Sequence, residues 1–155
     1  MTAIVILGAG PAGAAVALGL RRLGYAVTLV SEWRRFSALE GVSQRVLEAL
    51  RGAGLQQALA QATLPSQRQV NWNGQQHAQN VEFLLDRPTF DRGLREALRL
   101  AGVELIEGRV LTVQAIAGGH RVEMDGGQAV VADFLVEARG RQAPALGKGL
   151  RGPET

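Results

Sequence analysis

The pattern that most constrains the fold is a glycine motif between a strand and a helix. Residues 8–13 read Gly-Ala-Gly-Pro-Ala-Gly. They follow an apolar run at residues 3–7, typical of a strand buried on both faces, and they open a helical pattern over residues 11–23. A second apolar run at residues 25–30 completes a strand, a tight turn, a helix and a strand. The sequence therefore predicts a βαβ unit and a parallel sheet.

The motif residues favour a phosphate ligand for stated physical reasons. Gly8 permits the tight turn, Gly10 lets a pyrophosphate approach the backbone, and Gly13 allows close packing of helix on strand. Pro11 and Ala12 open the helix, whose exposed amides and dipole attract phosphate. We therefore predict that these five residues form a dinucleotide site. The alternative is a glycine-rich turn that binds no ligand.

An acidic residue follows the second strand where a ribose-binding carboxylate belongs. Glu32 lies nineteen residues after Gly13. A carboxylate accepts hydrogen bonds from a free ribose diol and repels a 2′-phosphate, so NADP is disfavoured as the tightly bound ligand. Arg34 and Arg35 keep that question open, although we favour a solvated loop for both. These features do not separate NAD from FAD.

The remaining pattern predicts two further helices and several strands. Helices are expected over residues 43–52, capped by Ser43, and over residues 88–102. The Gln- and Ala-rich stretch 56–69 is predicted as a helix followed by a loop broken at Pro65. Strands are expected at residues 69–72, 81–85, 103–107, 109–117, 120–124, 128–132 and 134–136. The three that span 109–132 predict an antiparallel meander.

Composition and charge exclude several classes of protein. The 155 residues are predicted to form one domain, and the absence of cysteine excludes a disulfide scaffold or a thiolate metal site. Neither histidine has a partner at metal-ligand spacing, so no metal site is expected. The apolar runs are too short to span a bilayer, and we expect a cytoplasmic protein without a membrane partner. The arginines alternate with acids, which disfavours nucleic acid as a partner.

Several segments together resemble a known family. They are residues 8–13 with Glu32, residues 40–43 (Glu-Gly-Val-Ser), residues 85–94 (Leu-Asp-Arg-Pro-Thr-Phe-Asp-Arg-Gly-Leu), residues 108–110 and residues 132–141. The organisation resembles the N-terminal part of flavoprotein monooxygenases of the p-hydroxybenzoate hydroxylase fold, over nearly the whole chain. This resemblance favours FAD over NAD, because NAD domains lack the meander and the helix that begins near Arg87.

The resemblance implies roles for further residues. Gly41 would lie in the segment that passes beside the flavin and its ribityl chain, and Arg87 would lie near the ribityl or the phosphates. Val110 would meet the adenine through its main chain, and Gly140 would join the cofactor-binding residues. From the residues alone, Arg87 can instead pair with Asp91 four positions on.

The chain also resembles one branch of this family, and it differs from the family pattern at several positions. The chain is similar to the tryptophan-halogenase-like and geranylgeranyl-reductase-like branch, and its tail at residues 140–144 and 151–153 resembles flavoproteins that oxidise residues in quinone-cofactor enzymes. Arg139 stands where the family has Thr, Ser or Asp, and no lysine precedes Lys148, so the halogenase lysine has no counterpart. The family's later Gly-Asp segment and substrate-binding sheet are missing. We therefore expect a fragment of a longer flavoenzyme that needs the remaining region.

The expected protein is the FAD-binding portion of a flavin-dependent, monooxygenase-like oxidoreductase. Its expected fold is α/β, Rossmann-like, with a parallel sheet and a meander. NAD(P)H is the expected transient reductant, the substrate is an unidentified small molecule or protein residue, and no catalytic residue is assigned. One alternative is the NAD-binding domain of a dehydrogenase, which predicts repeated βαβ units in place of the meander. Another is a non-catalytic nucleotide-binding module, which predicts ligand binding without electron transfer.

Overall fold

The computed structural model describes residues 2–33 and 36–143. The sequence-based question about Arg34 and Arg35, and the tail motif beyond residue 143, lie outside the described residues. The elements follow in the order β1 (Ala3–Leu7), α1 (Pro11–Arg22), β2 (Ala26–Ser31), β3 (Leu39–Val42), α2 (Gln44–Gly52), β4 (Ser66–Trp72), β5 (Gln75–Asp86), α3 (Arg87–Leu100), β6 (Glu104–Glu107), β7 (Val110–Ile116), β8 (Gly119–Met124), η1 (Asp125–Gly127), β9 (Ala129–Ala132), β10 (Phe134–Glu137) and η2 (Gly140–Gln142).

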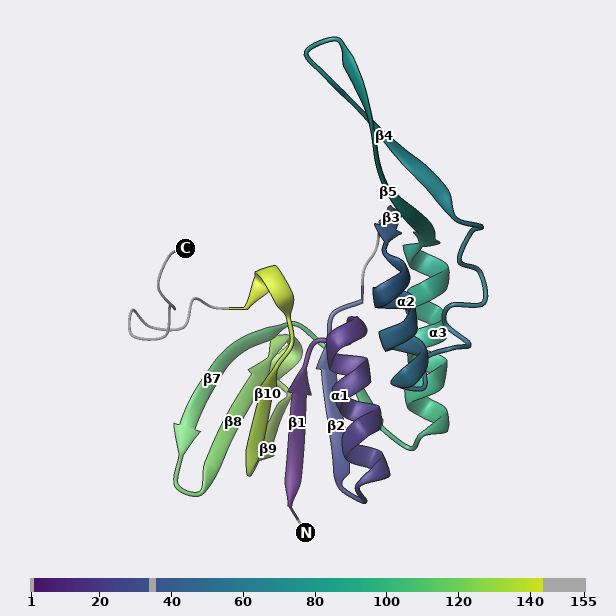
Figure 1. Ribbon diagram of the computed structural model, residues 1–155. Coiled ribbons are helices and arrows are strands. Elements are labelled where there is room, and N and C mark those ends of the chain that lie inside the picture. Colours follow the sequence, from purple (N-terminus) through teal and green to yellow (C-terminus); the bar gives the residue numbers. More distant parts are fainter. Residues whose placement is uncertain (1, 34–35, 144–155) are drawn as a thin grey trace.

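A parallel sheet of four strands forms the centre of the molecule, in the order β10-β1-β2-β6. The register places Ile4 beside Phe134 on one side and beside Val27 on the other. The first and last strands of the chain's described part therefore lie next to each other, with β1 between β10 and β2 (Figure 1). The predicted βαβ unit and α/β class are confirmed.

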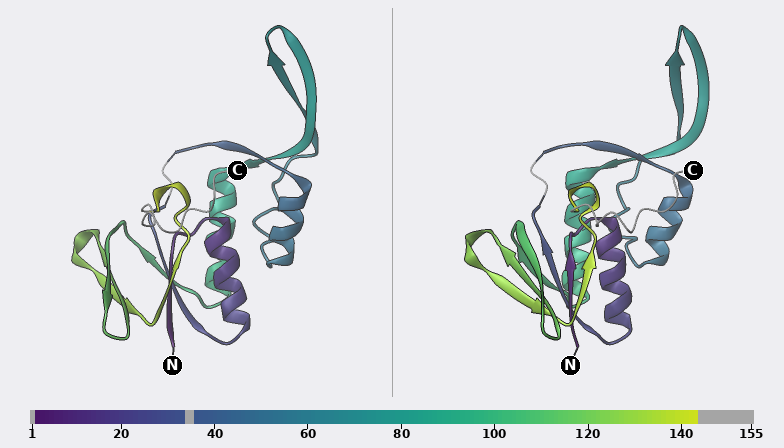
Figure 2. Two further views of the ribbon diagram at one scale, coloured as in Figure 1. Left: turned by 60° about the vertical axis from the view of Figure 1, so that its left-hand side comes forward. Right: turned by 90° about the vertical axis from the view of Figure 1, so that its left-hand side faces the viewer.

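The parallel sheet is covered on both faces (Figure 2). Ile4 and Ile6 belong to a core shared with α1 and α3, whereas Val5 and Leu7 pack with the meander residues Val122, Met124 and Ala132. Successive side chains of a strand point to opposite faces, so β1 must be apolar throughout. This explains why its sequence shows no alternation of polar and apolar residues.

The meander and a separate antiparallel sheet complete the fold. Strands β7, β8 and β9 pair antiparallel as predicted. Strands β3, β5 and β4 form the other sheet, and the β4–β5 hairpin extends away from the body (Figure 1). Its turn is Asn73-Gly74, both with positive φ, a residue pair typical of tight hairpin turns. The sequence analysis missed β3, whose pairing with the base of β5 is a long-range contact.

Helices α2 and α3 begin at capping residues. The Ser43 side chain accepts a hydrogen bond from the Val46 backbone N–H, which confirms the predicted cap. The Asp86 carboxylate accepts one from the Thr89 backbone N–H at 3.1 Å. The pKa of Asp86 lies below its ordinary value, mainly because its carboxylate accepts a hydrogen bond from the Thr89 side chain and, with a smaller effect, one from the Thr89 backbone.

The predicted helix within residues 56–69 is wrong. Residues 56–61 form successive turns in which the N–H groups of Ala58, Leu59 and Ala60 each bond three residues back. This pattern buries Leu55, Ala58 and Leu59 against the helices without an i→i−4 ladder. Close approach to α3 explains the tight turns, because a Cβ added at Gly93 would lie 2.6 Å from the Ala58 Cα.

Candidate functional site

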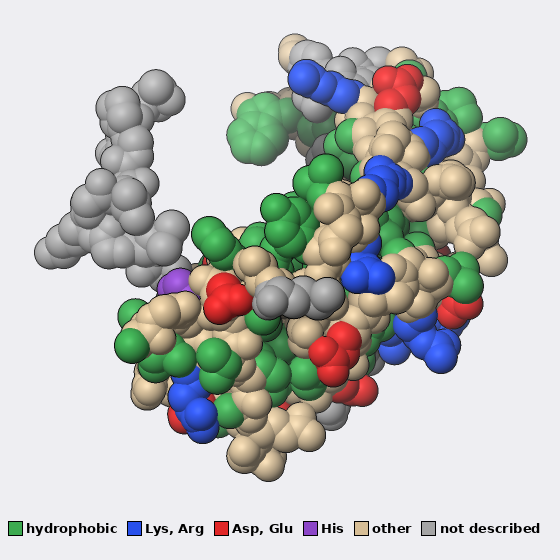
Figure 3. Space-filling model, turned by 90° about the horizontal axis from the view of Figure 1, so that it is seen from below, with side chains coloured by type: hydrophobic (Ala, Val, Ile, Leu, Met, Phe, Trp, Pro, Cys, Tyr) green, Lys and Arg blue, Asp and Glu red, His purple; other side chains and the backbone are tan. Residues whose placement is uncertain are grey.

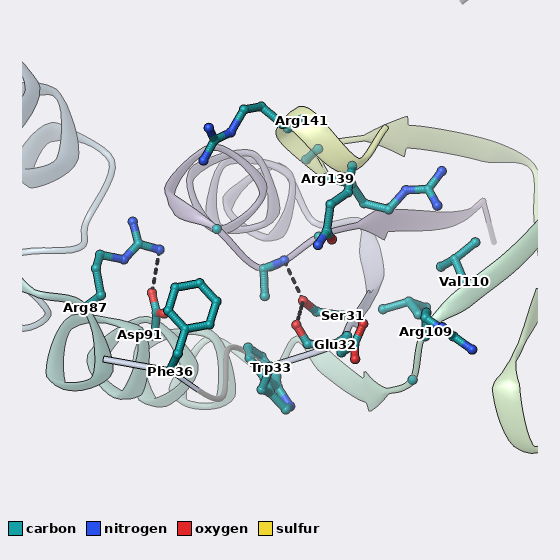
Figure 4. A pocket seen from close by; sticks show the side chains of 18 residues that line it. Ser31, Glu32, Trp33, Phe36, Arg87, Asp91, Arg109, Val110, Arg139 and Arg141 are labelled. Atoms are coloured by element: carbon teal, nitrogen blue, oxygen red, sulfur yellow. Dashed lines mark hydrogen bonds and ion pairs between the residues drawn. The ribbon is translucent and has the colours of Figure 1, made fainter. Parts of the chain in front are cut away.

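A cleft of about 810 Å³ opens at the carboxyl ends of the parallel strands (Figure 4). Ligands of open α/β sheets bind at this end of the strands. Segments far apart in the sequence meet there, and the lining residues are 8–10, 30–33, 36, 87, 91, 108–110 and 138–142. The cleft is therefore the place where the sequence-predicted site residues can be tested for proximity.

The three glycines of the motif occupy three different environments. Gly8 has φ +102°, and a Cβ there would lie 2.6 Å from the Ala138 carbonyl oxygen. A Cβ at Gly13 would lie 1.9 Å from the Gly8 carbonyl oxygen. Gly10 has no atom within 4 Å of the Cβ position and lines the cleft. The structure thus explains the tight turn at Gly8, the helix–strand contact at Gly13 and open space beside Gly10.

The N-terminus of α1 offers backbone donors to a ligand. Gly10 is the N-cap and supplies no side-chain hydrogen bond, and the first turn contains no acidic residue. The first four N–H groups of a helix lack intrahelical partners, and Pro11 has no N–H, so Ala12 and Gly13 carry donors of this kind. Together with the positive end of the helix dipole, these groups suit an anion such as a diphosphate.

Ser31, which the sequence analysis did not single out, fixes the glycine loop from the end of β2. Its Oγ accepts a hydrogen bond from the Ala9 N–H at 3.2 Å and donates to the Glu32 carbonyl at 3.2 Å. The Gly8 N–H donates to the Val30 carbonyl at 2.8 Å. A single serine after an apolar strand carries no sequence signal for this role. Glu32 follows it, is exposed and lines the cleft, and its ribose-binding role stays a prediction.

Arg87 lies at the opposite side of the cleft and is buried between two carboxylates. Its terminal nitrogens donate to Glu40 Oε2 at 2.9 Å and to Asp91 Oδ1 at 2.8 Å. The ion pair with Asp91 that the residues alone suggested is therefore present, and Arg87 also lines the cleft. Its Nε is buried and has no hydrogen-bond partner among the described residues. Arg87 thus joins β3 to α3 and keeps one donor unused in this structure.

Gly41 does not line the cleft. The atoms nearest to a Cβ at this position belong to the end of the Glu82 side chain, which can rotate away, so the structure shows no need for glycine here. A cofactor role for Gly41 stays a prediction.

The third side of the cleft follows β10. Glu137 accepts hydrogen bonds from the Arg139 backbone N–H at 3.0 Å and from its guanidinium Nε at 2.9 Å. Burial raises the pKa of Glu137, but the hydrogen bonds and charge of Arg139 outweigh it, so that the pKa lies below its ordinary value. Gly140 has φ +60° and begins η2, which brings Arg141 to the cleft.

Arginine side chains outnumber acids around the cleft. Arg87, Arg109, Arg139 and Arg141 line it together with only Glu32 and Asp91 (Figure 4). On the face seen from below, at the N-terminal end of β1, acidic and basic side chains are interspersed (Figure 3). Arg87 and Arg139 are paired with carboxylates, which leaves Arg109, Arg141 and the N-terminus of α1 as the positive groups that favour an anionic ligand.

Aromatic residues mark the loop after β2. Trp33 lines the cleft and stacks against the Arg95 guanidinium, 4.4 Å from the ring centroid. Phe36 also lines the cleft. Trp72 lies on the hairpin, away from the cleft residues, and is 71% exposed. Val110 also lines the cleft. Six of the predicted cofactor residues therefore meet there: Gly8, Gly10, Glu32, Arg87, Val110 and Gly140.

Neither a membrane-spanning helix nor a metal site is present in the part of the chain that the structure describes. No helix there is long and apolar enough to cross a membrane. Among the same residues, no group of three or more His, Cys, Asp or Glu side chains could hold a metal ion.

Comparison with solved structures found close similarity in fold. A peptidyl tryptophan dihydroxylase, QhpG, essential for tryptophylquinone cofactor biogenesis, is 65% identical, with a TM-score of 0.85 over 98% of this chain and 35% of that one. The Diels-Alderase PyrE3 of pyrroindomycin biosynthesis is 20% identical, with a TM-score of 0.72 over 90% of this chain and 32% of that one. A 2-methyl-3-hydroxypyridine-5-carboxylic acid oxygenase is 21% identical, with a TM-score of 0.65 over 87% of this chain and 38% of that one.

The last two comparisons concern the fold alone, and this chain spans about a third of the length of each of these structures. No curated protein with which the sequence was compared matches it. The family model of the FAD binding domain matches residues 1–149, almost the entire sequence. The glycine loop, the acid at the end of β2 and the arginine-lined cleft agree with that match, and the chain belongs to the FAD binding domain family.

Proposed function

We propose that this chain is the FAD-binding portion of a flavin-dependent monooxygenase that hydroxylates a tryptophan side chain within a polypeptide. The observation that carries the proposal is the 65% identity to a peptidyl tryptophan dihydroxylase across 98% of this chain. The meander supports a flavoprotein over the dehydrogenase alternative, which predicted further βαβ units in its place.

Different residues of the cleft suit different parts of a dinucleotide. The amides of Ala12 and Gly13 and the open backbone at Gly10 would hold the pyrophosphate. The Glu32 carboxylate would accept hydrogen bonds from the ribose hydroxyls. Arg87, which lines the cleft, would lie near the ribityl chain or the phosphates. FAD, when bound, supplies the transfer of electrons to oxygen, and the chain supplies binding and orientation.

Further parts of the proposal concern what acts on the cofactor. NAD(P)H is proposed as the electron donor, because inserting one atom of O₂ into a substrate requires two electrons from outside.

The halogenase-like and reductase-like branch stays a prediction, and the absence of lysine before Lys148 speaks against halogenase chemistry. We propose that additional polypeptide supplies the substrate-binding surface. A cytoplasmic location and the lack of nucleic-acid and membrane partners stay predictions from the sequence.

The first test is an absorbance spectrum of the purified chain after FAD is added and unbound FAD is removed. Retained flavin bands support the assignment, and calorimetry with ADP, FAD and NAD then ranks the ligands. Tighter binding of NAD than of FAD and ADP would contradict the proposal.

The second test uses the longer protein with a tryptophan-containing peptide, O₂ and NADH. The proposed activity predicts that NADH oxidation depends on the peptide and that mass spectrometry detects added oxygen on the tryptophan. Retained FAD with no peptide-dependent oxidation would instead favour the non-catalytic nucleotide-binding module.

A further inference from the structure

Residues 108–110, which lead from the end of β6 into the start of β7, form one wall of the cleft. The Gly108 N–H donates to the Ser31 carbonyl at 3.2 Å, one residue before Glu32. The wall therefore lies beside the carboxylate that suits the adenosine ribose. The position of this wall depends on the hydrogen bonds that hold its backbone in place.

Asp125 holds this wall from outside the cleft. The Arg109 N–H donates to Asp125 Oδ1 at 2.8 Å, and the Asp125 N–H donates to the Arg109 carbonyl at 2.9 Å. Asp125 itself does not line the cleft. Both backbone groups of Arg109 are thus fixed by a single residue sixteen positions later in the sequence.

Asp125 lies in a turn whose neighbouring residues fix its position. Met124, which precedes it, is 2% exposed and pairs with Val110 across the β7–β8 ladder. Gly126 and Gly127 follow with φ of +77° and +80°, a conformation that glycine adopts without strain. The Met124 N–H donates to the Gln128 carbonyl at 2.8 Å and closes the turn. An Asp-Gly-Gly stretch is typical of a turn and by itself indicates nothing about a ligand.

We propose that Asp125 is a positioning residue for the adenosine end of bound FAD, acting through the backbone of Arg109. The inference rests on the assignment of the cleft to FAD. Without the carboxylate, the wall loses the anchor of the Arg109 N–H and must be ordered when the ligand binds, which weakens binding. The flavin end of the cofactor is unaffected, because Asp125 reaches only the wall beside Glu32.

The chain contains a matched control with the same geometry away from the cleft. The Ala3 N–H donates to Asp133 Oδ2 at 2.7 Å, and the Asp133 N–H donates to the Ala3 carbonyl at 2.9 Å. Asp133 therefore makes the same reciprocal pair at the opposite end of the sheet. Replacing it removes an equivalent hydrogen bond without touching the wall.

The experiment compares Asp125→Ala, Asp125→Asn and Asp133→Ala in the 155-residue chain. Hydrogen exchange is first measured without ligand, and exchange of the Arg109 amide should accelerate in Asp125→Ala only. Calorimetry then measures binding of ADP and FAD. We expect about a five-fold rise in both dissociation constants for Asp125→Ala, which corresponds to about 1 kcal/mol, the typical net contribution of one hydrogen bond. Asp125→Asn keeps the accepting Oδ1 and should restore binding.

The readouts separate the proposal from a merely structural role. At saturating FAD, the visible spectrum of bound flavin should be the same in Asp125→Ala and the parent chain. Unchanged ADP binding in Asp125→Ala, or an equal loss in Asp133→Ala, would overturn the inference while leaving FAD binding intact. A parent chain that binds neither ADP nor FAD would overturn the proposed function and the inference together.

Discussion

Replacement of Gly13 by alanine tests whether close contact between α1 and β1 is what the glycine motif requires. Alanine is the better helix former, by about 1 kcal/mol at an interior position, so propensity alone predicts a more stable protein. The structure predicts the reverse, because the added Cβ would lie 1.9 Å from the Gly8 carbonyl oxygen and 3.3 Å from the Ala138 Cβ. The sign of the change therefore distinguishes the two arguments.

The size of the effect follows from the distance that the helix must move. Ordinary contact begins near 3.4 Å, so the Gly13 Cβ and the Gly8 oxygen must separate by about 1.5 Å. The obstructing atom belongs to backbone and cannot rotate away. Overpacking of this kind costs about 1–3 kcal/mol, and we take the upper end. After the gain in helix propensity, the free energy of unfolding should fall by about 2 kcal/mol, and the Tm by about 6 °C.

Urea denaturation followed by circular dichroism measures this change. Gly19→Ala is the matched control, because it lies on the same helix and its Cβ would have nothing within 4 Å. It should raise the free energy of unfolding by up to about 1 kcal/mol. If Gly13→Ala proved as stable as the parent while Gly19→Ala behaved as expected, the contact between helix and glycine turn would not be the reason for glycine at position 13.

Three further predictions concern the cleft. Gly10→Ala should change the free energy of unfolding by less than about 1 kcal/mol, because nothing lies within 4 Å of the added Cβ. It should raise the dissociation constant of FAD at least about ten-fold, because the Cβ enters the open space beside the helix N-terminus. Equal FAD dissociation constants for the variant and the parent would contradict this. Arg87→Met should lower the free energy of unfolding in urea by about 2 kcal/mol, since it leaves the partly buried Asp91 without its guanidinium, and adding Asp91→Asn should recover part of the loss. A single variant as stable as the parent would contradict this. The pKa of Glu137 is lowered, so its pairing with Arg139 stabilises the protein above pH 4.5 and is lost as the pH falls below that value. The difference in the free energy of unfolding between the parent and Arg139→Met should therefore shrink from pH 5 to pH 3. A constant difference in urea titrations would refute this linkage.

The parts of the fold that depend on local pattern were predictable. The apolar strand before Gly8, the helix after it and Glu32 at the end of β2 are all fixed by neighbours in the sequence. The meander was predictable for the same reason, because Gly118 and Gly126 punctuate its strands and both adopt positive φ. In these segments the periodicity, the turn residues and the final pairing agree.

The parts that depend on distant partners were not predictable from one sequence. Strand β3 reads Leu-Glu-Gly-Val, has no apolar alternation and exists through its pairing with β5. Ser31 and Asp125 are ordinary polar residues whose importance comes only from the backbone groups they meet. Arg87 was recognised as having two possible roles, and the structure shows that one guanidinium can make an ion pair and line the cleft together.

The neighbouring position of β1 and β10 has a consequence for the order of events during synthesis. The glycine turn is translated first, and its packing partner, the Ala138 carbonyl, is made about 130 residues later. A growing chain therefore carries an incomplete cofactor cradle until those residues have been made. Because a ligand stabilises only the conformation that it recognises, FAD added early cannot hold the first strands together, and its capture reports that the last strand of the sheet has been inserted.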